Sequence, residues 1–370
     1  MKKFQLTFIP ILLIFACLII SCKKDPVVDT NQVLIDQMKS VTDSLIKNTK
    51  VPGIVALVVD HTKGIDWLYS AGVSDIPNAI PMNANHTFRI GSNTKTMTGT
   101  VLLQLVDEGK IKLSDKLSKY YPEYPKADSI TIAMLCNMTS GIFNYTDDDA
   151  WGEECMNQPT KKWSPQELVD VGFSHDFYFS PGSNWKYSNT NTIIIGMIIE
   201  NLTGHSLEDE IKNRILIPLQ LNNTGLITDG LGLPGTHGRG YYSGEYIEND
   251  DVTEKFDVSW AWAAGSAYST PRELQKYVEN LVNGTFLSET LQHQRLNDLV
   301  ELDKNTGYGS YLLKRGSFYG HNGAIPGYTS SMYHSMDKNC TVIIYFNCLL
   351  DLHPDFLFFR FMDILYGESY

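Results

Sequence analysis

Ser92 and Lys95 open an apolar run in residues 88–111, FRIGSNTKTMTGTVLLQLVDEGKI. A serine hydroxyl is a poor nucleophile until a base removes its proton. Residues three apart on a helix share a face, so a lysine amine placed there can reach the hydroxyl if burial keeps it neutral. A serine in the first turn also lies near free backbone N–H groups that stabilise negative charge. The pair predicts a nucleophile and a base, and the alternative is the polar first turn of a core helix.

The Ser-x-x-Lys spacing is not specific by itself. Ser92 fits the chemistry best because Gly91 allows close backbone approach and a long helix-compatible run follows. In the match at Ser21 and Lys24, the expected signal cleavage before Cys22 would separate the serine from the lysine. The same spacing also occurs at Ser21–Lys24, Ser44–Lys47, Ser183–Lys186 and Ser335–Lys338.

Tyr187 and Asn189 lie just before a second apolar run, NTIIIGMIIE. A phenol there would relay a proton to a leaving group, and an amide would hold a substrate amide. The alternative is a loop pair that satisfies buried backbone groups. A copy of the Tyr-x-Asn pattern at Tyr345 and Asn347 falls inside an apolar strand and is predicted to be structural.

His321 and Gly323 belong to the segment YGHNGAIPGY, which we place at the end of a strand. The glycines keep side chains away from anything that docks beside it, so a substrate backbone would pair along this edge. The alternative for His321 is a core histidine bonded to a carbonyl.

Taken in order, FRIGSNTK (88–95), YSN (187–189) and HNG (321–323) resemble the three active-site motifs of the serine β-lactamase and D-alanyl-D-alanine carboxypeptidase family, in its class C β-lactamase-like branch. The resemblance spans about residues 51–348. It implies that Ser92 forms an acyl-enzyme and that Lys95 and Tyr187 share the proton transfers, without deciding which is the acylation base.

The resemblance also implies substrate-binding roles. Asn189 would hold the acyl-side amide, and the backbone N–H groups of Ser92 and Ala324, beside Gly323, would form an oxyanion hole. His321 departs from the lysine that β-lactamases of the family carry, and is more similar to the peptidase and esterase members. A neutral imidazole is a weaker carboxylate anchor than lysine.

The elements that must position these residues follow from the hydrophobic patterns. Residues 32–49 have a helical period, GIVALVVD and IDWLYSAG form a hairpin, and a helical, loop-rich middle follows. Strands return as YGSYLLKR, SFYGHNG, YTSSMYHSM and CTVIIYFNC, with a turn at Lys314, Arg315 and Gly316, before a final helix DFLFFRFMDILY.

We therefore predict an α/β plus all-α fold. One antiparallel sheet, built from N- and C-terminal strands and flanked by helices, carries an inserted helical domain, and the resemblance implies a β-lactamase/transpeptidase-like architecture. In this division residues 32–370 form the working domain, with 32–111 and 284–370 as its α/β part and 112–283 as its mainly helical part.

The N-terminal residues have the pattern of an export signal. Residues 1–21 hold two lysines and an apolar stretch too short for a convincing membrane span. The ending Ile-Ile-Ser-Cys resembles a bacterial lipoprotein box, which implies lipid attachment at Cys22 and a tether over residues 22–31. We expect a cell-envelope protein held to the membrane through Cys22, on the periplasmic or outer-membrane face. Plain secretion and an uncleaved anchor are the alternatives.

Composition excludes several functions. The formal charge of −12, without a basic block, argues against nucleic acid as a partner. No C-x-x-C or H-E-x-x-H motif appears, so we expect neither a metal site nor a cofactor. Cys340 and Cys348, read as members of one strand, would be too far apart to bond with each other. The cysteines are expected to be small core residues.

The motifs favour a serine hydrolase acting on a small peptide, amide, ester or lactam. D-amino-acid peptide hydrolysis, as in a D-alanyl-D-alanine carboxypeptidase or another D-peptidase, ranks first, with cell-wall peptide as one substrate. Ester hydrolysis ranks second and β-lactam hydrolysis third. A penicillin-binding module with poor turnover and a catalytically silent structural lipoprotein are the other classes.

Overall fold

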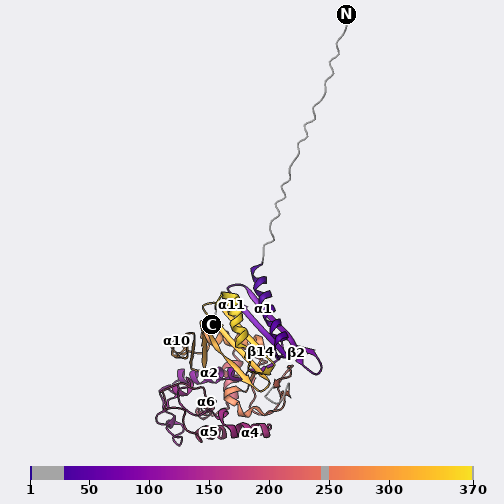
Figure 1. Cartoon of the computed structure of the whole chain (residues 1–370). Helices are drawn as coiled ribbons and strands as arrows, with labels where there is room; N and C mark the ends of the chain where they lie inside the picture. Colours follow the sequence, from indigo (N-terminus) through magenta and orange to yellow (C-terminus); the bar gives the residue numbers. More distant parts are fainter. Residues whose placement is uncertain (2–28, 243–249, 369–370) are drawn as a thin grey trace.

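The computed structural model describes Met1, residues 29–242 and residues 250–368. The expected signal and the lipidation site Cys22 lie outside these residues. Over the described ranges, none of the helices combines the length and apolar character needed to cross a bilayer. Figure 1 shows the large sheet with α1 and α11 above a group of helices that includes α4, α5 and α6.

A nine-stranded sheet dominates the described chain. Its order is β3-β2-β1-β14-β13-β12-β11-β10-β9, and every neighbouring pair is antiparallel. Strand β1 lies between β2 and β14, so the N- and C-terminal strands share one sheet, which confirms the predicted fold class. The bounds are β1 Gly53–Asp60, β2 Ile65–Asp75, β3 Ile80–Pro81, β9 Val300–Glu301, β10 Thr306–Gly309, β11 Leu312–Arg315, β12 Phe318–Ile325, β13 Tyr328–Ser335 and β14 Cys340–Phe346.

Helices cover both faces of this sheet, which explains why β1, β13 and β14 are buried along their whole length. Helices α1 (Thr30–Asn48) and α11 (Asp355–Tyr366) pack together on one face, and α9 (Pro271–Asn283) packs on the other. The division of the chain at residue 283 placed α9 in the helical part. Instead it contacts β1, β12, β13 and β14, because its apolar stripe faces the sheet.

The helical part lies against α2 (Thr94–Asp107), which contacts α6 (Asn189–Thr203) and α8 (Trp262–Gly265). Helix α6 is apolar on nearly all sides and is accordingly buried. Helix α2 therefore lies at the junction between the sheet and the helical part (Figure 1). The other helices are α3 Ile132–Cys136, α4 Asp149–Asn157, α5 Pro165–Phe173, α7 Leu207–Ile211, continued by a π turn Lys212–Leu216, and α10 Glu289–Asn297.

Local signals account for several helix ends. Ser164 and Glu167 form a reciprocal capping box at the start of α5. Gly204 and Gly284 adopt left-handed conformations at the ends of α6 and α9, as their positions in the sequence predicted.

Three strand predictions were wrong. The segment YGSYLLKR is a hairpin of β10 and β11, because Ser310 and Tyr311 adopt positive φ between them. The segment CTVIIYFNC ends its strand at Phe346, and Cys348 belongs to β15 (Cys348–Leu349), which pairs with β6 (Tyr241–Tyr242) in a small sheet with β7 (Asp250–Asp251). His321 lies in the middle of β12 rather than at its end.

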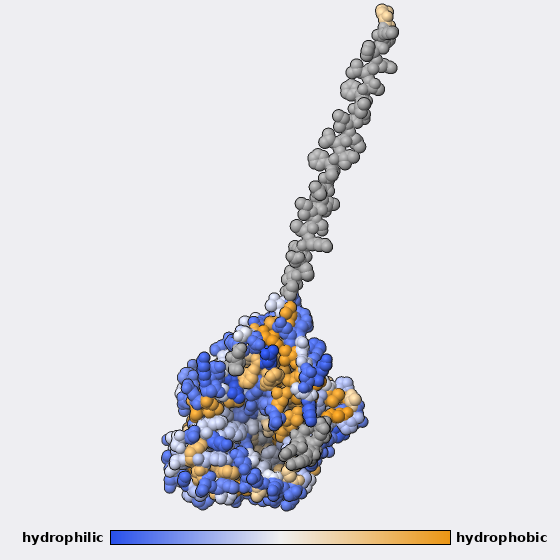
Figure 2. Space-filling view, in the orientation of Figure 1, coloured by the Kyte–Doolittle hydropathy of each residue, from blue (hydrophilic) through white to orange (hydrophobic). Residues whose placement is uncertain are grey.

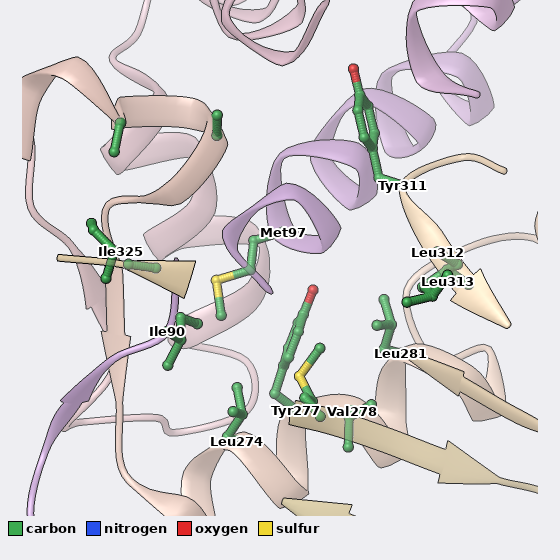
Figure 3. Packing of buried hydrophobic residues seen from close by; sticks show 14 of the residues in the cluster. Ile90, Met97, Leu274, Tyr277, Val278, Leu281, Tyr311, Leu312, Leu313 and Ile325 are labelled. Carbon is green, nitrogen blue, oxygen red and sulfur yellow. The ribbon is translucent and has the colours of Figure 1, made fainter. Parts of the chain in front are cut away.

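Part of the hydrophobic core fills the space between the sheet and α2. Figure 3 shows side chains of α2, α9 and the strands pointing toward one another there. The four described cysteines, Cys136, Cys155, Cys340 and Cys348, are free and buried, as expected for small core residues. Figure 2 shows a largely hydrophilic outer face with scattered hydrophobic patches.

Candidate active site

Ser92 lies in a short 3₁₀ turn, Gly91–Asn93, that leads directly into α2. The turn is held on two sides. The amide of Ile90 donates to Ala267 O at 2.9 Å, which ties it to β8 (Ala267–Ser269). Asn93 Nδ2 donates to Ser330 Oγ of β13 at 2.8 Å, which ties it to the large sheet. The nucleophile candidate is therefore fixed between the sheet and the small strand β8, which pairs with β4 (Phe88–Arg89) and β5 (Gly225–Leu226).

Two glycines let this turn touch β12. Gly91 has φ of +51°, and a Cβ atom there would lie 2.7 Å from Ala324 N. A Cβ atom at Gly323 would lie 2.0 Å from Ile90 O. Both distances are too short for any side chain, so glycine at both positions is required for Ser92 to approach the backbone of Ala324.

Lys95 directs its amine at Ser92. Its Nζ lies 3.0 Å from Ser92 Oγ and donates to Ala264 O at 2.7 Å. The side chain is fully buried, and burial lowers its pKa well below the usual range of lysine. A neutral amine in hydrogen-bond contact with the hydroxyl has the geometry of a general base.

Tyr187 lies beside this pair, in the loop before α6. Lys95 Nζ lies 4.9 Å from the centre of its ring. Burial raises the pKa of the phenol, and the neighbouring Ser92 hydroxyl lowers it by a smaller amount. Although the phenol oxygen is buried and faces Ser92, it makes no well-aligned hydrogen bond to any residue in the described ranges. The phenol therefore lies at the reacting centre next to Ser92, with no well-aligned hydrogen bond of its own in the described chain.

His321, from the third predicted motif, also reaches the site. Its ring centre is 6.2 Å from that of Tyr187. Nδ1 lies 2.5 Å from Asn322 O, and Nε2 lies 3.2 Å from the hydroxyl of Tyr308. Burial, with a smaller effect of Lys95, lowers the pKa of His321 to about 3. The imidazole is neutral at physiological pH and is a poor anchor for a substrate carboxylate.

Ala324 lies on an uncovered stretch of β12. Strand β11 pairs only with residues 318–320, whereas β13 pairs with residues 319–325 and begins with Tyr328 opposite Ile325. Since ladder bonds alternate along an antiparallel pair, the N–H and C=O of Asn322 and Ala324 point away from β13. The Ala324 amide therefore faces the same space as Ser92, the arrangement that an oxyanion hole requires.

Asn189, predicted to bind substrate, does not line the cavity at Ser92, and neither do Lys95 and Gly323. Its Nδ2 donates to Thr146 Oγ1 at 3.0 Å, and its backbone N–H donates to Asn144 Oδ1 at 2.9 Å. Asn189 is partly exposed but does not line the cavity at Ser92.

A cavity of about 470 Å³ opens at Ser92. This volume is typical of a site for a small ligand. The residues that sequence reasoning missed come mainly from β10, β11 and the segments before β10 and α11, where no motif marks them. Among them, Asn322 belongs to the HNG motif and Trp185 lies two residues before the YSN motif. The lining residues are Ser92, Trp185, Tyr187, Leu302, Asp303, Thr306, Tyr308, Leu313, Arg315, His321, Asn322, Ala324 and His353.

Known proteins are similar to this chain in sequence and fold. The family described as Beta-lactamase matches residues 37–356. Penicillin-binding protein 4* of Bacillus subtilis (strain 168) is 27% identical over 331 residues, which cover 83% of this chain and 72% of that protein. The putative penicillin-binding protein PbpX of the same organism is 24% identical, and this chain spans 66% of its length.

Two solved structures are similar over 90% of this chain and 99% of their own. They are a D-stereospecific amidohydrolase from Streptomyces sp., with 29% identity and a TM-score of 0.82, and the D-amino acid amidase from Ochrobactrum anthropi SV3 complexed with D-phenylalanine, with 27% identity and a TM-score of 0.79. The family match covers most of the chain and agrees with the buried Ser92–Lys95 pair. The chain belongs to the Beta-lactamase family of serine hydrolases.

Proposed function

We propose that this protein hydrolyses an amide or peptide bond next to a D-amino acid through an acyl-serine intermediate. The observation that carries the proposal is the buried Lys95 amine, 3.0 Å from Ser92 Oγ. The preference for a D-residue is supported by the similarity to a D-stereospecific amidohydrolase and a D-amino acid amidase.

In the proposed acylation, Ser92 Oγ attacks the substrate carbonyl carbon and its proton passes to the Lys95–Tyr187 pair. The tetrahedral oxyanion forms between the amides of Ser92 and Ala324; one such donor typically lowers the barrier by about 3 kcal/mol. The C–N bond then breaks, and the amine leaves with a proton delivered from the same pair. The buried phenol of Tyr187 is suited to this delivery because its oxygen faces Ser92 and makes no well-aligned hydrogen bond to another residue in the described chain.

Deacylation reverses these roles with water. Water loses a proton to the Lys95–Tyr187 pair and attacks the ester carbonyl, and Ser92 recovers its proton as the acid is released. Lys95 keeps its position through this cycle because Ala264 O accepts from its amine at 2.7 Å. In this proposal the side-chain amide of Asn189 gives up its hydrogen bond to Thr146 and instead holds the acyl-side amide of the substrate.

The proposal is tested by intact-mass measurement and turnover on four substrates: a D-alanyl-D-alanine peptide, D-phenylalanine amide, p-nitrophenyl acetate and nitrocefin. We expect a transient adduct on Ser92 and turnover of the first two. A stable adduct without turnover would identify a penicillin-binding module instead. Labelling by a fluorophosphonate that persists in Ser92→Ala would remove the nucleophile assignment.

We also propose that the protein is a lipoprotein of the cell envelope, attached through Cys22. The support comes from the lipoprotein-like ending of residues 19–22 alone. Expression of the whole chain in a bacterial host should give a detergent-soluble form whose N-terminal peptide carries acyl chains on Cys22. A Cys22→Ala variant that stays equally membrane-bound would contradict the proposal.

A further inference from the structure

Helix α11 begins against the middle of β12, next to the proposed oxyanion hole. Because β11 stops at residue 318–320 of β12, residues 321–325 have a neighbouring strand on one side only in the described chain. A backbone segment with few partners opens more easily than a central strand. The Ala324 amide belongs to this segment and must keep its place relative to Ser92 if it is to bind an oxyanion. Any further anchor of the segment therefore bears on the reaction.

Asp355, in the first turn of α11, supplies such an anchor. Asn322 Nδ2 of β12 donates to its Oδ2 at 2.9 Å, and Ser331 Oγ of β13 donates to its Oδ1 at 2.5 Å. Asn322 and Ser331 are cross-strand partners. Tyr333, further along β13, donates its hydroxyl to the same carboxylate at 3.2 Å. One carboxylate thus joins the two strands two residues before Ala324.

His353 adds a second contact between the start of α11 and β12. The backbone N–H of Asp355 donates to Nδ1 of His353 at 3.2 Å, so in the neutral imidazole the proton is on Nε2. Nε2 lies 3.2 Å from Gly323 O, to which it donates. Asp355 and His353 together therefore hold the two residues that directly precede Ala324. We call this pair the α11 clamp.

The contacts of the clamp suit a carboxylate better than an amide at position 355. The side chain of Asp355 is buried, and each of its two oxygens accepts a hydrogen bond from a different strand. Burial by itself raises its pKa, but His353, the hydrogen bond from Ser331 and the charge of Arg315 together lower the pKa below its usual range, so the group is ionised at neutral pH. An asparagine has a single acceptor oxygen and would accept from one strand at a time.

We propose that Asp355 is a positioning residue of the oxyanion hole, which holds residues 322–324 so that the Ala324 amide stays directed at the oxyanion. This inference rests on the proposed acyl-serine chemistry and adds to it a residue that does not line the cavity at Ser92. Because the full oxyanion charge develops only on the way to the tetrahedral intermediate, the clamp acts on kcat and not on substrate binding.

The kinetic test uses D-phenylalanine amide with Asp355→Asn and Ser331→Ala. Ser331 is buried and outside the cavity, so its removal breaks the β13 arm of the contact without touching substrate. We expect Asp355→Asn to lower kcat/KM by about 10- to 100-fold and to change KM by less than about threefold. Ser331→Ala should lower kcat/KM by about 3- to 10-fold, and the double variant should lose little more than Asp355→Asn alone, since the two residues share one interaction.

A spectroscopic test reports on the oxyanion hole itself. Isotope-edited infrared difference spectra of the acyl-enzyme formed with p-nitrophenyl acetate give the stretching frequency of the ester carbonyl. A donor amide polarises this carbonyl and lowers its frequency. We expect a higher frequency in Asp355→Asn and Ser331→Ala than in wild type, because the Ala324 amide is less well directed. A role in stability alone would lower the melting temperature and leave this frequency unchanged.

Asp363→Asn is the matched control, since Asp363 lies on the same helix, half exposed, and pairs with Arg360. It should leave kcat, KM and the carbonyl frequency as in wild type. Wild-type kcat/KM and frequency in Asp355→Asn, or a change in KM alone, would overturn the inference. If Asp355→Asn does not fold, Ser331→Ala decides by the same two measurements. Failure of all four substrates to acylate Ser92 would instead overturn the proposed function.

Discussion

Tyr308 donates a hydrogen bond to Nε2 of His321, with 3.2 Å between the two atoms. The direction follows from the other nitrogen. Asn322 O can only accept, so Nδ1 carries the proton in its 2.5 Å contact, and the neutral ring leaves Nε2 as an acceptor. Both nitrogens are engaged inside a buried cluster. The imidazole is thereby held in one tautomer and cannot take up a proton without losing the Tyr308 bond.

This arrangement predicts an acid-sensitive contribution to stability. The pKa of His321 is about 3 in the folded protein and near 6.5 when unfolded, so between these values only the unfolded state binds the proton. The free energy of unfolding should therefore fall as pH drops from 6.5 toward 3, by up to about 1.4 kcal/mol per pH unit from this group. Urea unfolding of wild type and His321→Gln at pH 4 and 7 should show a smaller acid loss in the variant. Exposed His293→Gln should behave as wild type.

The protonation of Lys95 should set the acid limit of activity. Its neutral form is the active one, and burial lowers its pKa, so activity should be kept above that lowered pKa and lost as pH falls through it. Lys95→Arg, which stays charged, should lower kcat/KM by about 10²- to 10⁴-fold at every pH. Profiles of kcat/KM from pH 5 to 9 check this. If kcat/KM of Lys95→Arg falls at low pH in the same way as that of the wild type, the titrating group is not Lys95.

Tyr187→Phe should slow turnover by about 10²-fold or more, the usual scale of general acid–base help. Because its hydroxyl makes no well-aligned bond in the described chain, its removal should leave the melting temperature unchanged or slightly higher. Tyr311→Phe removes another buried hydroxyl, outside the cavity, and should leave turnover unchanged. Full activity in Tyr187→Phe would exclude the phenol from the mechanism.

Gly91→Ala should damage both stability and activity. The positive φ at Gly91 costs alanine about 1 kcal/mol or more, and the clash with Ala324 N would push β12 away from Ser92. We expect a lower melting temperature and at least about a 10²-fold slower acylation, since an oxyanion donor is displaced. Gly152→Ala in α4, where a Cβ meets no atom within 4 Å, should instead stabilise. A fully active Gly91→Ala would contradict the close approach of β12.

The sequence predicted the pattern of the fold well because its signals are local. The apolar periods of β1, β2, α1 and α6 and the capping residues of α5 each specify their element without reference to the rest of the chain. The sequence did not predict the break between β10 and β11 or the end of β14. In both places the apolar residues continue through the break, so the hydrophobic pattern does not mark it. Only the positive φ of Ser310 and Tyr311 marks the first one.

The candidate site was predictable where a motif accompanies a helix start, as at Ser92 and Lys95. Arg315, Tyr308 and His353 were not, since they come from separate elements and their convergence depends on how β11 stops short of the middle of β12. For Asn189 the sequence predicted a substrate contact, whereas in the structure its side-chain amide donates to Thr146 Oγ1.

Strand β1 pairs with β14 from Ile54, which lies opposite Phe346, to Asp60, which lies opposite Cys340. The centre of the sheet therefore cannot close until nearly the whole chain has been synthesised. Contacts between such distant segments slow folding, because the intervening chain must be ordered first. The turn that carries Ser92 is anchored to β13, next to β14, through Ser330. A growing chain should thus remain catalytically silent, and a fragment that lacks residues after 339 should have neither a stable sheet nor a reactive serine.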